Sequence, residues 1–280
     1  MDYLRWRETK LFQYPTHAQQ LMIDIENPSA LTPVEKSRLL QVLHQTNVVF
    51  YRVRGEAATK HDIRQLGEQL GLQRLDSNLC ADEDSITSLR VVDTGRHGGY
   101  IPYTNKPLSW HTDGYYNPAD NQIRAILMHC VTPAYIGGEN ALLDHEILYV
   151  LLRDEDPALI SALMHPQAMS IPPNREDGEE IRGETIGPVF SIMSDGHLHM
   201  RYSARTRNIR WRDDPVTTRA VMRINAILAS NCPYLFRYTL QANEGVISNN
   251  VLHNRSGFED AGDHKRLLYR ARYYDRTLEN

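Results

Sequence analysis

The sequence has few cysteines and no long apolar run, and both shortages exclude whole classes of protein. Its three cysteines, Cys80, Cys130 and Cys232, are odd in number and widely spaced, so they predict neither a disulfide framework nor a paired-cysteine zinc site. No stretch approaches the roughly eighteen consecutive apolar residues of a membrane span, and the first residues lack the apolar segment of a secretory signal. We therefore expect a soluble, cytoplasmic protein with reduced thiols.

A large excess of charge of either sign is also missing. The formal net charge is −4, and no block of like charges is long enough to bind nucleic acid or an anionic membrane. Hydrophobic residues make up 41% and charged residues 24%, which is the balance of a folded protein. A chain of 280 residues can bury one substantial core, and we expect a single domain over residues 1–280.

The first 75 residues predict a helix, a strand and a second helix. Thr32, Pro33 and Glu35 have the spacing of a capping box with proline at the first helical position, so a helix is expected from there to about Gln45. The β-branched and aromatic run at residues 47–51 predicts a buried strand. An apolar face over residues 60–70 predicts the second helix.

Residues 72–108 are polar and predict a long loop system with one strand, at 89–92. Short strand-like runs separated by turns follow, at 123–130, 189–193, 198–202, 235–240, 245–248 and 267–274. Helical inserts are expected over about 145–164 and 214–230. This order predicts an α+β, mainly β fold: a double-stranded β-helix (jelly roll, cupin-like) with flanking helices, whose core spans residues 105–275.

The centre of the functional argument is the pair His111 and Asp113. Two ligands two residues apart on an extended chain share one face and can bind one ion, and an imidazole with a carboxylate suits divalent iron. The spacing alone is weak evidence, because a chain with 12 histidines and 35 acidic residues can contain such a pair by chance. This is the only His-x-Asp/Glu pair in the sequence.

A third ligand is needed, and His253 is the best candidate. It comes just after a predicted strand and before a polar loop, where it can project into the mouth of a barrel. A hydrogen-bonded histidine in the core or at the surface is the alternative for any single histidine. Arg266 follows thirteen residues later, and its planar guanidinium is suited to bidentate capture of a carboxylate.

Four blocks of the sequence together resemble the taurine dioxygenase (TauD/TfdA-like) family of Fe(II)- and 2-oxoglutarate-dependent oxygenases. They are WHTD at 110–113, GGEN at 137–140, LHNR at 252–255 and RLLYR at 266–270. Their order and spacing match the family from about Val48 to Tyr274. The resemblance implies that His111, Asp113 and His253 bind iron and that Arg266 binds the distal carboxylate of 2-oxoglutarate. Implied cofactors are therefore Fe(II), 2-oxoglutarate as cosubstrate, and O2.

The approach to the first histidine, IPYTNKPLSWH at 101–111, is similar to the γ-butyrobetaine and trimethyllysine hydroxylase branch, without that branch's N-terminal zinc module. Three positions qualify the resemblance. Asn140 stands where taurine enzymes have a threonine that helps to bind 2-oxoglutarate, and its amide can still donate a hydrogen bond. Arg272 replaces an aromatic residue of the trimethylammonium cage, which disfavours a quaternary amine. Asp113 retains the carboxylate that related halogenases lack, which favours oxygenation.

The implied reaction is oxidation of an unactivated C–H bond, by hydroxylation or desaturation, with release of succinate and CO2. Alternation along the last strand places Arg266, Arg270 and Arg272 on one face, which suits a small anionic or amino-acid-like substrate; ordinary salt bridges are the alternative. The other candidate substrate contacts flank the metal motif or follow the central strands: Tyr100, Tyr103, Trp110, Tyr115, Tyr116 and Arg207. For each aromatic residue, core packing is the alternative.

Two other functions stay open at this point. The first is an oxygenase that acts on a peptide or carrier-bound substrate, and the second is a catalytically silent jelly roll that binds a ligand. The four residues His111, Asp113, His253 and Arg266 favour an enzyme, because a binding module does not need all of them. We expect a small-molecule substrate and neither nucleic acid nor membrane as partner, and we leave open whether the protein forms a homo-oligomer.

Overall fold

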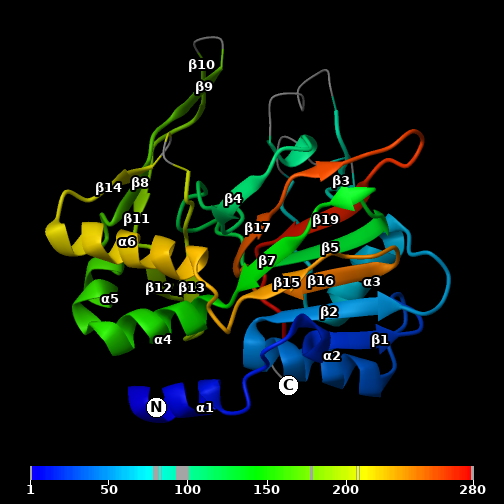
Figure 1. Ribbon diagram of the computed structural model, residues 1–280, viewed down its shortest axis with the longest axis horizontal. Coiled ribbons are helices and arrows are strands. Elements are labelled where there is room, and N and C mark those ends of the chain that lie inside the picture. The colour runs from blue at the N-terminus through cyan, green and yellow to red at the C-terminus, as the bar shows by residue number, and fades with distance from the viewer. Residues whose placement is uncertain are drawn as a thin grey trace.

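Two facing sheets form the centre of the molecule, with helices outside them (Figure 1). The computed structural model describes residues 2–77, 82, 84–92, 101–176, 179–205, 207 and 209–278. The larger sheet has the strand order β1-β2-β16-β5-β19-β3. Its strands are β1 Met22–Ile25, β2 Val48–Val53, β3 Thr87–Leu89, β5 Ala125–Thr132, β16 Glu244–Ser248 and β19 Leu267–Tyr273. The smaller sheet has the order β15-β7-β17-β4, with β4 Leu108–His111, β7 Asn140–Leu143, β15 Phe236–Tyr238 and β17 Leu252–Arg255.

Alternation along the central strands divides the apolar side chains between two cores. In β2, Val48 and Phe50 join the core that also contains Leu142 and Leu252 of the smaller sheet. Their neighbours Val49 and Tyr51 join the other core, on the opposite face of the larger sheet. Successive side chains of a strand point to opposite faces, so one strand fills both cores. The larger sheet is therefore covered on both faces, which explains its continuous apolar runs.

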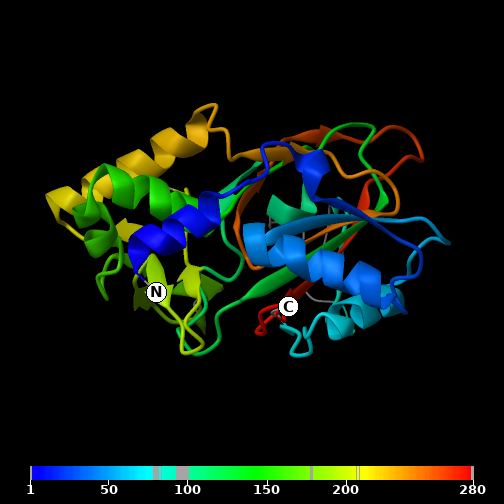
Figure 2. The ribbon, with the colours of Figure 1, turned by 90° about the horizontal axis from the view of Figure 1, so that it is seen from below.

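Helices α2 Pro33–Thr46 and α3 Lys60–Gln69 pack on the outer face of the larger sheet (Figure 2). The capping box at the start of α2 is present. The Thr32 side chain accepts a hydrogen bond from the Glu35 amide, and the Glu35 carboxylate accepts one from the Thr32 amide. This helix and the strand after it confirm the expectations for residues 32–51. Helix α1, Tyr3–Leu11, and β1 were not predicted from the sequence. β1 pairs in parallel with β2, so the N-terminal segment extends the larger sheet.

The helical inserts lie beside the smaller sheet. The predicted helix over 145–164 is wrong as a single element, because it is divided into α4 His145–Glu155 and α5 Pro157–Leu163. Asp156 ends the first helix, and its side chain caps the second at the Ala158 amide. A proline after an N-cap residue favours the start of a new helix, and this signal explains the break. The second insert is confirmed as α6 Pro215–Ala229.

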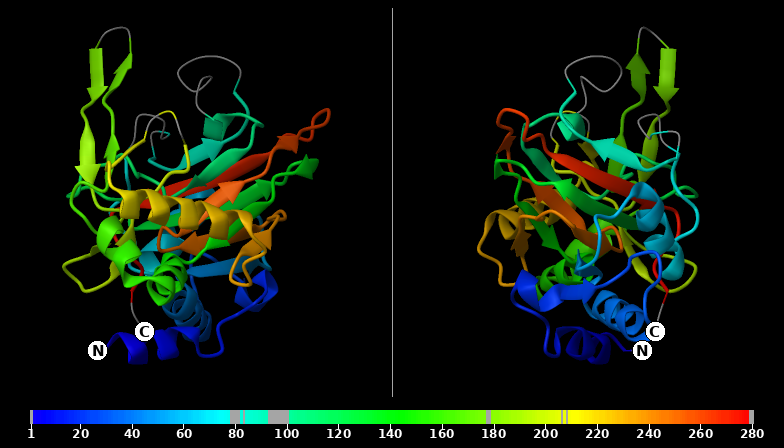
Figure 3. Two further views of the ribbon diagram at one scale, coloured as in Figure 1. Left: turned by 60° about the vertical axis from the view of Figure 1, so that its left-hand side comes forward. Right: turned by 90° about the vertical axis from the view of Figure 1, so that its right-hand side faces the viewer.

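Most predicted strands are present with shifted ends, and several short strands were missed. The confirmed ones include β5, β15, β16 and β19, whereas the strand predicted at 89–92 lies earlier, as β3. β12 Phe190–Ile192 and β13 Leu198–Met200 are present but shorter than the strands predicted at 189–193 and 198–202. The missed strands are β1, β4, β7 and β17, together with β6 Ile136–Gly137, β8 Met169–Ile171, β9 Asn174–Glu176, β10 Glu179–Arg182, β11 Thr185–Gly187, β14 Arg210–Trp211 and β18 Phe258–Glu259. Figure 3 shows the pair β9 and β10 projecting from the body of the molecule. The short 3-10 helices are η1 Ala18–Leu21 and η2 Ile101–Tyr103.

The two facing sheets and outer helices make the fold a double-stranded β-helix, or jelly roll, with flanking helices, as the sequence predicts. Within the described residues, no helix is long and apolar enough to cross a membrane. Cys130 is buried and Cys232 is half-buried, and neither forms a disulfide. Cys80 lies outside the described residues.

Gly245→Ala tests the close contact between β16 and β2. A Cβ atom at residue 245 would lie 2.2 Å from the ring of Tyr51, a fully buried side chain. Overpacking of this kind costs about 1–3 kcal/mol, so the free energy of unfolding in urea should fall by that amount. In Gly183→Ala the nearest atom is 3.5 Å away, and the change should stay within about 0.5 kcal/mol. Equal effects of the two variants would contradict the packing argument.

Candidate metal centre

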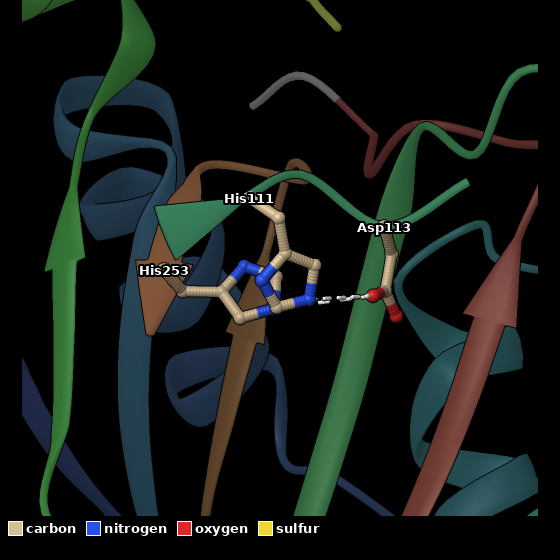
Figure 4. A group of neighbouring side chains, drawn as sticks. All are labelled: His111, Asp113 and His253. Atoms are coloured by element: carbon tan, nitrogen blue, oxygen red, sulfur yellow. Dashed lines mark ion pairs between the residues drawn. The ribbon is translucent and has the colours of Figure 1, made fainter. Parts of the chain in front are cut away.

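Two histidines from different strands of the smaller sheet lie directly opposite each other. His111 is the last residue of β4, and His253 is its antiparallel partner in β17. Their ring centroids are 4.3 Å apart (Figure 4). The register shifts between His253 and Arg255, and such bulges redirect side chains beside functional sites. His253 was expected after a strand, whereas the structure places it within one.

Asp113 completes the group from the segment that follows β4. Its Oδ1 atom lies 3.3 Å from His111 Nε2 and 3.9 Å from His253 Nε2. One ligand atom of each of the three residues lies within 4.8 Å of the others, which is a geometry that can hold a metal ion. All three side chains are largely buried, at 6–9% exposure. Sequence spacing predicted the His111 and Asp113 pair, and the fold brings His253 to it.

The protonation states of His253 and Asp113 suit metal binding. Burial lowers the pKa of His253 to about 4, so this imidazole is neutral at pH 7. Burial alone would raise the pKa of Asp113, but the Arg270 and Arg272 guanidinium groups outweigh it and hold that pKa well below its usual range. Metal ligands must be deprotonated, and the site presents two imidazoles and an ionised carboxylate.

Hydrogen bonds at the far side of each ring fix the orientation of the histidines. His111 Nδ1 lies 2.9 Å from the Ser109 carbonyl, and His253 Nδ1 lies 2.9 Å from the Val251 carbonyl. A carbonyl can only accept a hydrogen bond, so Nδ1 carries the ring proton and the Nε2 lone pair is free to bind a metal ion. Asp113 Oδ2 is buried and has no hydrogen-bond partner within the described part of the chain. A cation would satisfy it, and the donor set is the one that non-haem Fe(II) oxygenases use.

A separate pocket contains Arg266 and Asn140. Its polar lining comes from Cys130, Asn140, Thr239 and Arg266. Arg266 is 5% exposed, stacks over the Phe258 ring at 4.9 Å, and has no acidic side chain within ion-pair distance among the described residues. Leu142 is paired with His253, and Asn140, two residues earlier in β7, shares its face of the sheet. A carboxylate in this pocket would therefore meet a buried guanidinium on the histidine side of the sheet.

The three arginines at the end of the chain have different surroundings. Arg270 Nη1 lies 3.5 Å from Asp113 Oδ2, and the buried Arg270 Nε has no hydrogen-bond partner among the described residues. Arg272 forms a buried ion pair with Asp76 and donates to the Tyr116 hydroxyl at 3.1 Å. For Arg272, the alternative of salt bridging applies. Arg270 pairs with the candidate metal ligand Asp113, and Arg266 has no carboxylate partner among the described residues.

The other predicted contacts are spread over several elements. Tyr115 and Tyr116 follow Asp113 and Gly114, and their rings pack edge to face with centroids 5.3 Å apart. Tyr103 is 2% exposed within the core between the sheets, and Trp110 packs against the same core. Arg207 is exposed, and Tyr100 lies outside the described residues. Asp76 and Thr239 were missed, because nothing in the sequence links them to positions so far along the chain.

The jelly roll and its two-histidine, one-carboxylate group define the class of non-haem iron oxygenases. The chain belongs to the family described as "Taurine catabolism dioxygenase TauD, TfdA family", whose model matches residues 10–272. It is an Fe(II)- and 2-oxoglutarate-dependent dioxygenase, as the resemblance of the four sequence blocks implies.

Similar proteins include two that act on a nucleotide by name. A uridine-5'-phosphate dioxygenase of Streptomyces sp is 29% identical over 214 residues, which cover 69% of this chain and 71% of the relative. Another, of Amycolatopsis sp, is 27% identical over 192 residues, 67% of each chain. The structure of an asparagine oxygenase with Fe(II), 2S,3S-3-hydroxyasparagine and succinate superposes with a TM-score of 0.58. It is 12% identical, and the match covers 98% of this chain and 92% of that one.

Asp76→Asn tests the Arg272 ion pair. The variant leaves a buried guanidinium without its counter-charge, and the loss of one partner of a buried pair costs about 3–5 kcal/mol. Urea unfolding should show a loss of that size. Asp24→Asn is the control, because Asp24 is 48% exposed in its pairs with Arg52 and Arg54, and it should cost less than about 1 kcal/mol. Similar losses in both variants would refute the buried-pair assignment.

Proposed function

We propose that this dioxygenase oxidises an unactivated C–H bond of a small anionic substrate, by hydroxylation or desaturation, and releases succinate and CO2. His111, Asp113 and His253 hold Fe(II) in this proposal, and Arg266 with Asn140 binds the distal carboxylate of 2-oxoglutarate. The bound iron supplies the coupling between reduction of O2, oxidative decarboxylation of 2-oxoglutarate and oxidation of the substrate. The observation that carries the proposal is the convergence of three ligand atoms within 4.8 Å. A pocket that contains the buried Arg266 supports the cosubstrate assignment.

Neighbouring residues hold the proposed metal ligands in the tautomer and charge state that bind a metal ion. The Ser109 and Val251 carbonyls hold both imidazoles in one tautomer, so no proton has to leave Nε2 when a metal binds. Arg270 keeps the Asp113 carboxylate ionised. Arg266 is 5% exposed, and its attraction for a carboxylate is stronger there than it would be in open water.

The preference for an anion rests on Arg270. Its guanidinium reaches within 3.5 Å of the proposed metal ligand Asp113, and its Nε hydrogen has no partner among the described residues. A phosphate, sulfonate or carboxylate of the substrate would accept from it, with the reactive carbon close to the metal. The two uridine-5'-phosphate dioxygenases support a phosphate monoester, and uridine 5'-phosphate is therefore the first compound to test.

The finer expectations about partners remain part of this proposal. A free small molecule is favoured over a peptide or carrier-bound substrate, because the buried Arg270 accommodates a compact anionic group. Cytoplasmic location without a nucleic acid or membrane partner is supported by the net charge of −4 and by the two free cysteines.

Arg266→Ala tests the cosubstrate assignment separately from the metal. Anaerobic titration of the wild type with Fe(II) and then 2-oxoglutarate should produce the visible charge-transfer band of the chelated complex. Arg266→Ala should keep its Fe(II) affinity but bind 2-oxoglutarate at least about 30-fold more weakly, because a buried charge loses its partner. His253→Ala should lose both.

Arg255→Ala is the matched control for this titration. Arg255 and Arg266 both stack on the Phe258 ring, at 4.8 and 4.9 Å, but Arg255 donates to the Thr104 and Lys106 carbonyls. It should therefore leave 2-oxoglutarate affinity within a few-fold of the wild type. Unchanged affinity in Arg266→Ala, or an equal loss in Arg255→Ala, would refute the assignment.

Uridine 5'-phosphate should stimulate succinate formation and give an oxidised product, whereas uridine should react at least about 100-fold more slowly, since a buried charge pair is lost. Succinate and the nucleoside product are measured by mass spectrometry, with taurine and asparagine as alternative substrates. Arg270→Lys keeps the positive charge beside Asp113 but loses the planar guanidinium that can donate two hydrogen bonds to one phosphate. The variant should therefore raise KM for uridine 5'-phosphate more than it lowers kcat. Equal turnover of uridine would exclude an anion-dependent substrate.

A further inference from the structure

The side chain of Asn250 forms hydrogen bonds with the main chain of Asp113. Its Oδ1 accepts from the Asp113 amide at 2.8 Å, and its Nδ2 donates to the Asp113 carbonyl at 2.9 Å. The same Nδ2 donates to the Ile123 carbonyl at 2.6 Å. Asn250 is 1% exposed and has a φ of +52°, a left-handed conformation that asparagine tolerates better than most residues. One side chain therefore forms hydrogen bonds with both the amide and the carbonyl group of the Asp113 backbone.

These bonds replace a strand partner that Asp113 lacks. β4 ends at His111, and the ladder between β4 and β17 fixes the two histidines. Thr112 is held by Tyr202, whose carbonyl accepts from the Thr112 amide at 3.0 Å. Asp113 comes after the last of these pairings, so its position in the described structure depends on Asn250. A ligand outside the ladder needs such support to stay at a fixed distance from the other two.

The third bond of Asn250 closes the segment that begins at Asp113. Ile123 lies at the other end of this segment, which contains Tyr115 and Tyr116. Gly114 has a φ of +63°, and a Cβ there would lie 2.5 Å from the Ile123 side chain, so the two ends approach each other closely. Asn250 thus holds both ends of the segment at one point.

The neighbouring Asn249 also forms three side-chain hydrogen bonds, but none of them is with a candidate metal ligand. Its Nδ2 donates to Asn47 Oδ1 at 3.1 Å, and its Oδ1 accepts from the Thr277 amide and hydroxyl. It is 3% exposed. Asn249 therefore joins the larger sheet to the C-terminal segment, with the same side chain, burial and number of side-chain bonds as Asn250.

We propose that Asn250 is the positioning residue for the carboxylate ligand: it fixes Asp113 against His111 and His253 and so sets the metal affinity of the site. The inference rests on the proposed metal site, and it adds a residue that does not touch the metal.

Asn250→Gly is the direct test, because glycine accepts the left-handed backbone and removes only the side chain. Co(II) affinity, measured anaerobically by the visible absorption of the bound ion, should fall about 10- to 100-fold, as for other residues that orient metal ligands. The gain in Tm on addition of a fixed Co(II) concentration should shrink accordingly. Asn249→Gly should lower the Tm of the metal-free protein but keep the wild-type Co(II) affinity.

Two further variants separate positioning from general damage. Asn250→Asp keeps the oxygen that accepts from the Asp113 amide, but it replaces the Nδ2 donor to the Asp113 and Ile123 carbonyls with a second oxygen. Its Co(II) affinity should therefore lie between those of Asn250→Gly and the wild type. If Asn250 acts through Asp113, then Asn250→Gly should not weaken Co(II) binding further in an Asp113→Ala background.

The outcomes are distinct. Wild-type Co(II) affinity in Asn250→Gly, or an equal loss in Asn249→Gly, would overturn the role of Asn250 while leaving the metal site intact. Additive losses in the Asp113→Ala background would also overturn it. Absence of Co(II) binding in the wild type would instead overturn the proposed function, and with it the inference.

Discussion

The pairing of β17 with β4 is the interaction on which the rest of the site depends. Because His253 is the antiparallel partner of His111, two residues far apart in the sequence become neighbours with ring centroids 4.3 Å apart. Backbone hydrogen bonds fix this distance more firmly than side-chain packing alone, which suits a site that must present its ligands at fixed positions. Asp113 follows the end of β4 and has no strand partner there. The Asn250 side chain instead forms the hydrogen bonds with its amide and carbonyl groups.

Electrostatic compensation is the second constraint. Arg266, Arg270 and Arg272 lie at the start of the chain's last strand and within it, and their surroundings differ. Arg272 is neutralised by Asp76, and Arg270 by Asp113, while Arg266 has no carboxylate partner in the described residues. Because an unpaired buried charge is costly, the unpaired position is where an anionic ligand gains most. This asymmetry distinguishes Arg266 from the two paired arginines, which their spacing in the sequence does not.

Local signals in the sequence predicted the elements that depend on local interactions. The capping box at Thr32 and the Asp214-Pro215 start of α6 are present, because caps and proline act within one helical turn. The same chemistry at Asp156 and Pro157 divides the helix that was expected to run through them. Short strands such as β4 and β17 were missed, since strands of four residues are stabilised by their partners and not by their own propensity.

The sequence by itself determined the reaction class: a single His-x-Asp pair, a distant histidine and a following arginine match one family in order and spacing. The single-domain organisation over residues 1–280 stays a prediction. Only the tertiary structure decided which groups meet. Asp76 reaches Arg272 and Asn250 binds the main chain of Asp113, and neither contact has a sequence signal. Asn140 and Arg266 were both candidates from the sequence, but only the fold places them in one pocket. The physical reason is that strand register and sheet stacking set long-range contacts, whereas motifs report only the chemistry available at each position.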